Sequence, residues 1–462
     1  PRHTGDFSMF RVYASKDNRP AAYSPQNVPY RPKKHFSIST KGVKEGDFTM
    51  IYGFPGNTQE YILSDAVAYI AERSDPAKIA IRTGRLDIIT KAQESDPALR
   101  IHYAAKHASI ANAWKKWQGE ALGIDRRGTV AAKFDYETQF GLWSVGRPEY
   151  AGVVMGLRAE YDRIMDAYFA YEITRETLST LPAAYTPEER AEECFARRKF
   201  AEQALWRHAF REYGRCPKVY RTPSYAEGIA RYKSPEAYAD ALFEAVWEGS
   251  DSVAMQPAVR LREETKRMLD HISWMLGTKS LRNLNSKILN ELYTTYIKGL
   301  REWDRERAFY PDANLTLRVA YGSVAGYEYA DGEYHKPQTT LDGIIAKDNP
   351  EIYDYDIPQS LRDLYASKNY GRWGTVIDGR RTVPVCFLAT NHTTGGNSGS
   401  PVLNAGGELI GINFDRTWRS TMSDIAYDPA ICRNIAVDIR YVLFVVDRVG
   451  GAGYLLKEMT LK

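Results

Sequence analysis

The sequence feature that most constrains the fold is a glycine-rich loop at residues 393–402, Thr-Thr-Gly-Gly-Asn-Ser-Gly-Ser-Pro-Val. An apolar run at 383–389 precedes the loop, and a Gly406-Gly407 turn with a second apolar run at 408–414 follows it. This order is typical of a strand, a glycine loop and a β-hairpin. Such a loop presents one serine hydroxyl at a sharp turn, and its glycines free the backbone to aim N–H groups at an oxyanion.

The loop is similar to Gly-Asp-Ser-Gly-Gly-Pro, the nucleophile loop of chymotrypsin-fold serine peptidases. This resemblance implies that Ser398 is the nucleophile and that the backbone N–H groups of Gly396 and Ser398 form the oxyanion hole. The alternative is a Gly/Ser hairpin without chemistry. A bare Gly-x-Ser-Gly would favour that alternative, whereas the complete decapeptide between two strand-like runs favours the peptidase hypothesis.

Composition narrows the class of protein. At 462 residues the chain is too long for one small core, so two or three domains are expected. Hydrophobic residues make up 44% and charged residues 26%, which is ordinary for a globular protein. The net charge of +4 gives no reason to expect nucleic acid or an anionic membrane as a partner. We find no apolar run of membrane-spanning length, so no membrane partner is expected.

The cysteines do not indicate a metal site. Cys194, Cys216, Cys386 and Cys432 form no Cys-x-x-Cys pair, so no zinc ribbon or thioredoxin-like motif is predicted. No metal or cofactor is expected. The chain starts at Pro1, without Met or a signal-like apolar segment, so we expect a fragment or a processed chain.

The predicted secondary structure changes twice along the chain. Residues 1–57 are β-rich, with strand-like runs at 7–13 and 47–52. Residues 58–310 have helical periodicity, and strands return over 311–462. The last segment includes strand-like runs at 435–440 and 441–446. This order predicts one β domain interrupted by a large helical insertion.

Two helix starts within the insertion carry clear local signals. Thr186-Pro187-Glu188-Glu189 is a capping box with proline at the first helical position, and it predicts a helix running toward Gly214. Ser234-Pro235 predicts a second helix that ends at Gly249.

A nucleophilic serine needs a histidine and an orienting carboxylate. His392, six residues before Ser398, is unusually close in sequence for a general base. In the chymotrypsin fold the histidine precedes the aspartate. Only His3 precedes the first plausible aspartate here, and it is three residues away, so this sequence is predicted to lack the catalytic histidine. Asp6, just before a strand-like run, is the candidate carboxylate, and a turn aspartate is the alternative. His102 and His107 are five residues apart, which disfavours a shared metal on one helix face.

Several long motifs resemble the bacterial dipeptidyl-peptidase 7/11 family of serine exopeptidases. The resemblance extends over essentially the whole chain and is carried by residues 1–8, 53–58, 112–117 and 393–401. It implies a chymotrypsin-like double β-barrel with a helical domain inserted between the triad aspartate, Asp6, and the nucleophile, Ser398. It also implies that the triad histidine and the N-terminal part of the first barrel lie in a segment absent from this sequence. The interval from Asp6 to Ser398 is shorter than usual for the family, so a loop is also expected to be missing.

The strand after the serine carries the specificity hypothesis. It contains Asp415 and Arg416, which as strand neighbours point to opposite sides. An arginine at the base of a pocket pairs bidentately with an acidic side chain. The resemblance implies that arginine at position 416 marks the acidic-specific branch, dipeptidyl-peptidase 11, whereas relatives with glycine there prefer apolar residues. The alternative is a surface Asp415–Arg416 ion pair worth at most about 1 kcal/mol.

The resemblance also implies partners and location. Substrates are expected to be peptides with a free N-terminus, contacted by Asn112 and with Asp415 as a nearby carboxylate, while the helical domain caps the cleft. A homodimer in the periplasm or on the cell surface of a Gram-negative bacterium is implied as well. Three hypotheses remain: an exopeptidase releasing dipeptides with Asp or Glu second, an endopeptidase of the same fold, and a non-catalytic peptide-binding fragment.

Overall fold

The computed structural model describes residues 7–249, 252–277 and 284–462. The chain divides into two compact units. One is formed by Pro1–Glu60 together with Asp312–Lys462, and the other by Tyr61–Pro311. The second unit is therefore an insertion in the first, and the predicted triad carboxylate Asp6 lies outside the described residues.

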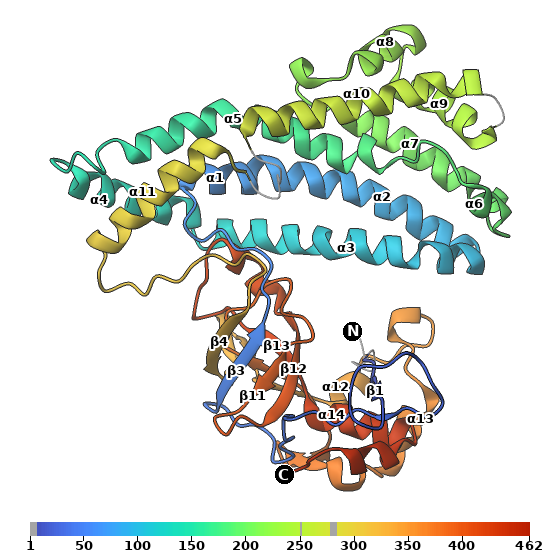
Figure 1. The fold of residues 1–462 in the computed structure, drawn as a ribbon, viewed down its shortest axis with the longest axis vertical. Coiled ribbons are helices and arrows are strands. Elements are labelled where there is room, and N and C mark those ends of the chain that lie inside the picture. Colours follow the sequence, from blue (N-terminus) through green and yellow to red (C-terminus); the bar gives the residue numbers. More distant parts are fainter. Residues whose placement is uncertain (1–6, 250–251, 278–283) are drawn as a thin grey trace. The chain divides into compact units, whose positions relative to one another are not determined.

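The inserted unit is helical (Figure 1). Its long helices α2 and α3 lie side by side. A core rich in tyrosine and phenylalanine, including Phe140, Tyr161 and Phe243, holds most of the unit together. None of the described helices combines the length and the apolar character that crossing a membrane requires. The helices are α1 (Ser64–Ala68), α2 (Asp75–Ser95), α3 (Pro97–Arg126), α4 (Thr129–Ser144), α5 (Val153–Glu176), α6 (Pro187–Ala191), α7 (Lys199–Tyr213), α8 (Pro223–Tyr232), α9 (Pro235–Glu248), α10 (Ser252–Leu276) and α11 (Lys287–Trp303).

The sequence signals predicted both ends of helix α9 correctly. For α6 they predicted the start correctly but placed the end too far along the chain. Helix α9 begins where Ser234 caps the N–H of Ala237 and ends at Gly249 in the left-handed conformation. The capping box at Thr186 forms, but α6 ends at Ala191 and does not continue to Gly214. The chain turns there, which brings Phe195 into the core, where its ring stacks on Trp247 with a centroid separation of 4.2 Å.

The other unit is built on a seven-stranded sheet in the order β4-β3-β11-β12-β13-β10-β7. A bridge between Val324 and Ala389 joins the end of β4 to β10, so six of these strands close on themselves. Their interior is filled by Ile51, Val324, Phe387, Val402, Ile410 and Ala436. The sheet strands are β3 (Phe48–Gly53), β4 (Arg318–Ser323), β7 (Gln338–Thr340), β10 (Pro384–Ala389), β11 (Pro401–Leu403), β12 (Leu409–Arg416) and β13 (Asn434–Asp438).

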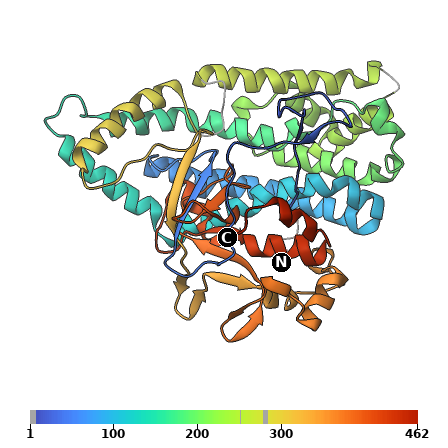
Figure 2. The same cartoon turned by 60° about the horizontal axis from the view of Figure 1, so that its bottom comes forward.

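Smaller elements cover the outside of the closed sheet. Figure 2 shows helix α14, in red, beside the strands, and its residues Tyr441 and Phe444 share a core with Val385 and Val437. The remaining pairs of strands form three short ribbons or hairpins at the periphery. These elements are α12 (Leu341–Ile345), α13 (Gln359–Ser367), α14 (Ile439–Phe444), β1 (Tyr13–Ala14), β2 (Val28–Pro29), β5 (Tyr327–Ala330), β6 (Glu333–His335), β8 (Thr375–Ile377) and β9 (Arg380–Thr382).

Strand β3 corrects the expected role of residues 1–57. The family resemblance implies two β-barrels, with residues 1–57, which contain Asp6, in the first and residues 311–462, which contain Ser398, in the second. In the structure β3 pairs with β11, whose Val402 lies opposite Ile51, and with β4 on its other side. Residues 48–53 therefore belong to the sheet of the serine loop. The pairing spans about 350 positions of sequence and leaves no local signal.

Two predicted strands are also wrong. Of residues 7–13 only Tyr13 enters a strand, paired with Pro29, and the exposure of Phe10 and Val12 shows that the alternating run buries no face. Residues 441–446 are helical, because Asp438 caps the N–H of Arg440 and opens α14. A short apolar run fits a buried helix as well as a buried strand.

Candidate active site

The serine loop connects β10 to β11. It exposes Ser398 to solvent, while two nearby residues of the loop are buried. Its neighbours Asn397 and Ser400 are 3% and 8% exposed, whereas Ser398 is open to solvent. Two glycines allow this shape, since Gly396 has φ 107° and Gly399 has φ 85°, both in the left-handed region. The hydroxyl of Ser398 donates a hydrogen bond to the carbonyl oxygen of Phe414 at 3.2 Å. The predicted nucleophile is therefore exposed and lies against strand β12.

Buried asparagine side chains hold the loop from below. Asn397 accepts a hydrogen bond from the N–H of Thr394, which closes the turn that precedes the serine. Asn413 on β12 donates to the carbonyl oxygen of Asn397 at 3.2 Å and accepts from Asn434 on β13 at 2.9 Å. Buried amides that donate hydrogen bonds to one another and to the backbone in this way fix the backbone they bind. The loop is therefore tied to two neighbouring strands of the closed sheet.

The segment after β3 holds the loop from the other side. Gly56 donates its N–H to the carbonyl oxygen of Gly395 at 2.6 Å. Gly53 lies so close to Asn397 and Ser400 that a Cβ at this position would collide with both side chains. The motifs at 53–58 and 393–401, two of those that carry the family resemblance, thus pack directly against each other.

The backbone N–H groups of the loop divide into two sets. Those of Asn397, Gly399 and Ser400 donate to the carbonyl oxygens of Thr394, Asn413 and Asn397. Within the part of the chain that the structure describes, those of Gly396 and Ser398 donate to no protein acceptor. These are the two groups predicted to form the oxyanion hole, so the loop has donors to offer a developing negative charge beside the serine.

Arg416 ends strand β12, two residues beyond Phe414. A bulge between Asn413 and Asp415 interrupts the pairing with β13 at this point, and bulges commonly redirect side chains next to active sites. The Arg416 guanidinium contacts the two carboxylate oxygens of Asp424 at 2.5 and 2.9 Å. The predicted alternative, a surface pair of Asp415 with Arg416, is wrong, because the Asp415 carboxylate accepts the backbone N–H of Arg416 instead.

The His392 imidazole does not hydrogen-bond to the Ser398 hydroxyl in the described part of the structure. Its Nε2 lies 3.0 Å from the carbonyl oxygen of Ser423, and its Nδ1 lies 3.5 Å from Glu60. Burial lowers the pKa of the His392 imidazole, although the hydrogen bond to Ser423 opposes this shift. Among the described residues no histidine is hydrogen-bonded to the Ser398 hydroxyl. His392 therefore has a structural role, through its contacts with Ser423 and Glu60.

The two residues predicted to contact a substrate amino terminus are both exposed. Asp415 lies on β12 of the unit that carries Ser398. Asn112 lies on α3 of the helical unit.

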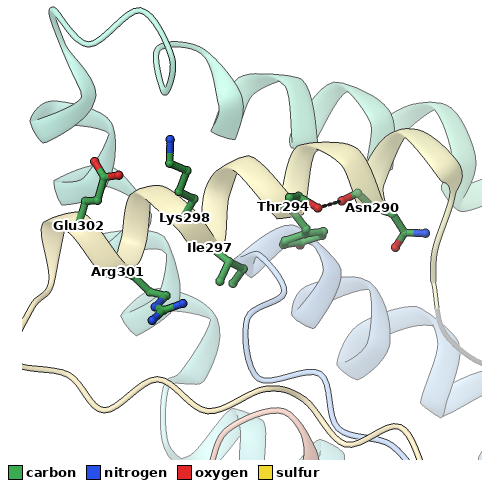
Figure 3. Close-up of a pocket in the computed structure, with 7 residues that line it drawn as sticks. Asn290, Thr294, Ile297, Lys298, Arg301 and Glu302 are labelled. Atoms are coloured by element: carbon green, nitrogen blue, oxygen red, sulfur yellow. Dashed lines mark hydrogen bonds between the residues drawn. The ribbon is translucent and has the colours of Figure 1, made fainter.

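A pocket in the helical unit offers no comparable chemistry. Figure 3 shows that its labelled lining residues all come from helix α11, with Thr294 donating to the backbone carbonyl of Asn290. Its charged groups are Lys298, Arg301 and Glu302, and no serine, cysteine or histidine is among its lining residues. The serine loop is therefore the candidate active site.

One cluster of metal-ligand residue types occurs among the described residues, at His102, Glu192 and Cys194. Arg198 donates to His102 Nε2 at 2.6 Å, so the neutral ring carries its proton on Nδ1, which faces Glu192 at 3.4 Å. Burial, and next the charge of Arg198, lowers the pKa of His102. A metal ion on Nδ1 would require a proton on Nε2, pointing at the guanidinium. The cluster is better described as a hydrogen-bonded group than as a metal site.

Sequence reasoning missed the groups that support the site. Asn413, Asn434 and Asp424 have no motif of their own, and their partners are 8 to 21 residues away. The only signal in the sequence was polar residues at positions of an otherwise apolar strand pattern, as at Asn413.

Comparison with known proteins agrees with the serine-loop assignment. A family model described as peptidase S46 matches residues 1–193 and 186–461. An Asp/Glu-specific dipeptidyl-peptidase of Capnocytophaga gingivalis is 40% identical over 507 residues, covering 100% of this chain and 70% of the relative. The enzyme of the same description from Flavobacterium psychrophilum is 41% identical over 501 residues, covering 100% of this chain and 69% of the relative.

The fold has a solved counterpart. The crystal structure of Porphyromonas endodontalis DPP11 in complex with the dipeptide Arg-Glu superposes with a TM-score of 0.83 at 32% sequence identity. The match covers 100% of this chain and 71% of that chain. Both the helical insertion and the closed sheet thus have equivalents in a peptidase with a bound dipeptide.

Proposed function

The chain belongs to the peptidase S46 family, and on that premise we propose that it is a serine exopeptidase that releases N-terminal dipeptides with Asp or Glu in the second position. The observation that carries the proposal is that the Ser398 hydroxyl, in the loop before β11, lies against β12, the strand that ends at Arg416. The serine hydroxyl rests on the Phe414 carbonyl, and Arg416 follows two residues later. A nucleophile and a cation so placed fit a peptide whose residue before the cleaved bond is acidic.

The reaction follows from the loop geometry. Ser398 Oγ attacks the carbonyl carbon that follows the second residue, and its proton passes to a general base. The N–H groups of Gly396 and Ser398 stabilise the oxyanion of the tetrahedral intermediate. The amine of the shortened peptide leaves with a proton, and water then hydrolyses the acyl-enzyme to release the dipeptide. We propose Asp6 as the carboxylate that orients the base, a histidine, on the family resemblance alone.

Recognition of the free amino terminus completes the proposal. An exopeptidase that counts two residues needs acceptors for an ammonium group. Asp415 carries a charge suited to that role on the strand of Arg416, and Asn112 is proposed on the family resemblance alone. We further propose that the closed six-stranded sheet is one of the two barrels of a chymotrypsin-like peptidase domain.

The experiment compares substrates with free and blocked amino termini on the intact protein, together with any residues that flank this sequence in its natural source. Fluorogenic dipeptides ending in Asp are offered with a free or an acetylated amine. Cleavage of the free form alone supports the exopeptidase. Equal cleavage of both forms supports an endopeptidase. Cleavage of neither, with no labelling of Ser398 by a serine-directed phosphonate, supports a non-catalytic peptide-binding protein.

Two further proposals rest only on the family resemblance. We propose a homodimer, which light scattering of the purified protein tests directly. We also propose a periplasmic or cell-surface location in a Gram-negative bacterium, which fractionation of the source cells tests.

A further inference from the structure

The contacts of Asp424 suggest a role in specificity that the sequence did not reveal. Asp424 ends a 3₁₀ helix at Trp418–Asp424, which follows β12 and turns its last residues back to the strand end. The side chains of Arg416 and Asp424 are each only 12% exposed. Ser423 adds a third contact by accepting a hydrogen bond from Arg416 Nη1 at 2.9 Å. The guanidinium is therefore fixed by two consecutive residues of one short helix.

These two residues are themselves fixed by other segments. The backbone oxygen of Asp424 accepts the N–H of Gln59 at 2.6 Å. The backbone oxygen of Ser423 accepts a hydrogen bond from His392 Nε2 at 3.0 Å. Since Gln59 and His392 come from distant parts of the sequence, the end of the helix cannot shift without breaking contacts on both sides.

A fixed guanidinium recognises a carboxylate better than a mobile one. Arginine has many rotamers, and ordering them on binding lowers affinity. Its five N–H donors form a rigid planar fork. A carboxylate partner that holds one edge of the fork also sets the direction in which the rest of it points.

We propose that Asp424 is a positioning residue that orients Arg416 for recognition of an acidic second residue of the substrate. This inference rests on the proposed function. Asp424 acts through Arg416 and does not itself touch the peptide. If Asp424 instead competed with the substrate for Arg416, its replacement would increase the preference for Asp.

The test measures kcat and KM of the intact protein on free-amino fluorogenic dipeptides ending in Asp or Leu. Asp424→Ala and the isosteric Asp424→Asn are expected to lower kcat/KM for the Asp substrate about tenfold or more, mainly through KM. The value for the Leu substrate should change by less than about threefold. Asp424→Glu, which keeps the carboxylate, should restore part of the loss.

A matched control and a double variant separate positioning from stability. Asp348 makes a similar bidentate pair with Arg362, at 2.7 and 2.8 Å, in the same unit. Asp348→Ala should leave the Asp-to-Leu preference unchanged. In an Arg416→Gly background, adding Asp424→Ala should leave that preference unchanged too, because coupled residues are not additive.

The outcomes distinguish the inference from the function it rests on. Wild-type cleavage of the Asp substrate with an unchanged preference in Asp424→Asn overturns the inference alone. An increased preference for Asp in that variant also overturns it, and indicates competition. Failure of the wild type to cleave either substrate overturns the proposed function and the inference together. If Asp424→Ala does not fold, the asparagine and glutamate variants give the result.

Discussion

The backbone of Gly396 lies directly against the carbonyl oxygen of Phe54. A Cβ at position 396 would overlap that oxygen and would lie 3.0 Å from the nitrogen of Gly56. The φ of 107° at Gly396 is also one that side chains rarely allow. The serine loop and the segment after β3 therefore fit together only with hydrogen at this position.

Gly396→Ala is expected to damage catalysis more than folding. The added methyl group must push the loop away from Phe54, which moves the N–H predicted to stabilise the oxyanion. Losing one such donor lowers kcat by about a hundredfold. Gly407→Ala is the control, because Gly407 also has a positive φ of 72°, but a Cβ there meets no atom within 4 Å. We expect Gly407→Ala to lower stability by about 1 kcal/mol and to keep kcat. Equal kcat in both variants would contradict the oxyanion assignment.

Asn413→Ala is expected to lower the free energy of unfolding by about 2 kcal/mol or more. It leaves the buried Asn434 amide without its acceptor and removes one of the two donors to the Asn397 carbonyl oxygen. Chemical denaturation measures the change. The comparison is Asn349→Ala, whose amide oxygen accepts the N–H of Glu351 at an exposed turn and whose loss should cost about 0.5 kcal/mol. A loss for Asn413→Ala no larger than that would show that the buried amides do not hold the serine loop.

The buried imidazole of His392 should make the β unit sensitive to acid. Burial lowers its pKa in the folded state below the ordinary value of 6.5, so the unfolded chain takes up a proton before the folded one does. The free energy of unfolding therefore falls as the pH drops from about 6.5 through the lowered pKa. His392→Gln should show a smaller loss between pH 7.5 and 5.5, a range chosen around the ordinary pKa of about 6.5. His35→Gln, at an exposed residue, should behave as wild type. The same acid sensitivity in both variants would contradict this role.

The cysteines should be unreactive in the folded protein. All four are buried and free, and burial raises the pKa of Cys386 to about 12 and that of Cys216 to about 11. Since the thiolate is the reactive form, a thiol reagent should label none of them at neutral pH. All four should react after denaturation. Rapid labelling of the native protein, or fewer than four reactive thiols after denaturation, would contradict the burial.

Local signals in the sequence predicted what short segments determine. The glycines of the serine loop, the cap at Ser234 and the Gly406-Gly407 turn each act within a few residues, and the structure confirms the helix and the hairpin that they predict. The closing of the sheet could not be predicted in this way, because β3 and β11 find each other across the whole helical insertion.

The candidate site shows the same division. Ser398 and Arg416 could be named from a motif and a family resemblance, whereas Asp424 could not. Asp415, next to Arg416 in sequence, was the obvious partner for the arginine. The 3₁₀ helix after β12 brings Asp424 to the guanidinium instead, while the Asp415 carboxylate bonds to its neighbour's backbone. Which carboxylate pairs with Arg416 therefore depends on the turn after β12, and residue propensities do not specify that turn.

The measurement that tests the central claim most directly is cleavage of free-amino fluorogenic dipeptides ending in Asp, Leu or Arg. The intact wild type is compared with Ser398→Ala and Arg416→Gly. We predict that the wild type prefers Asp, that Ser398→Ala loses all cleavage, and that Arg416→Gly retains activity but shifts from Asp toward Leu. Cleavage that survives in Ser398→Ala, or an undiminished preference for Asp in Arg416→Gly, would contradict the account.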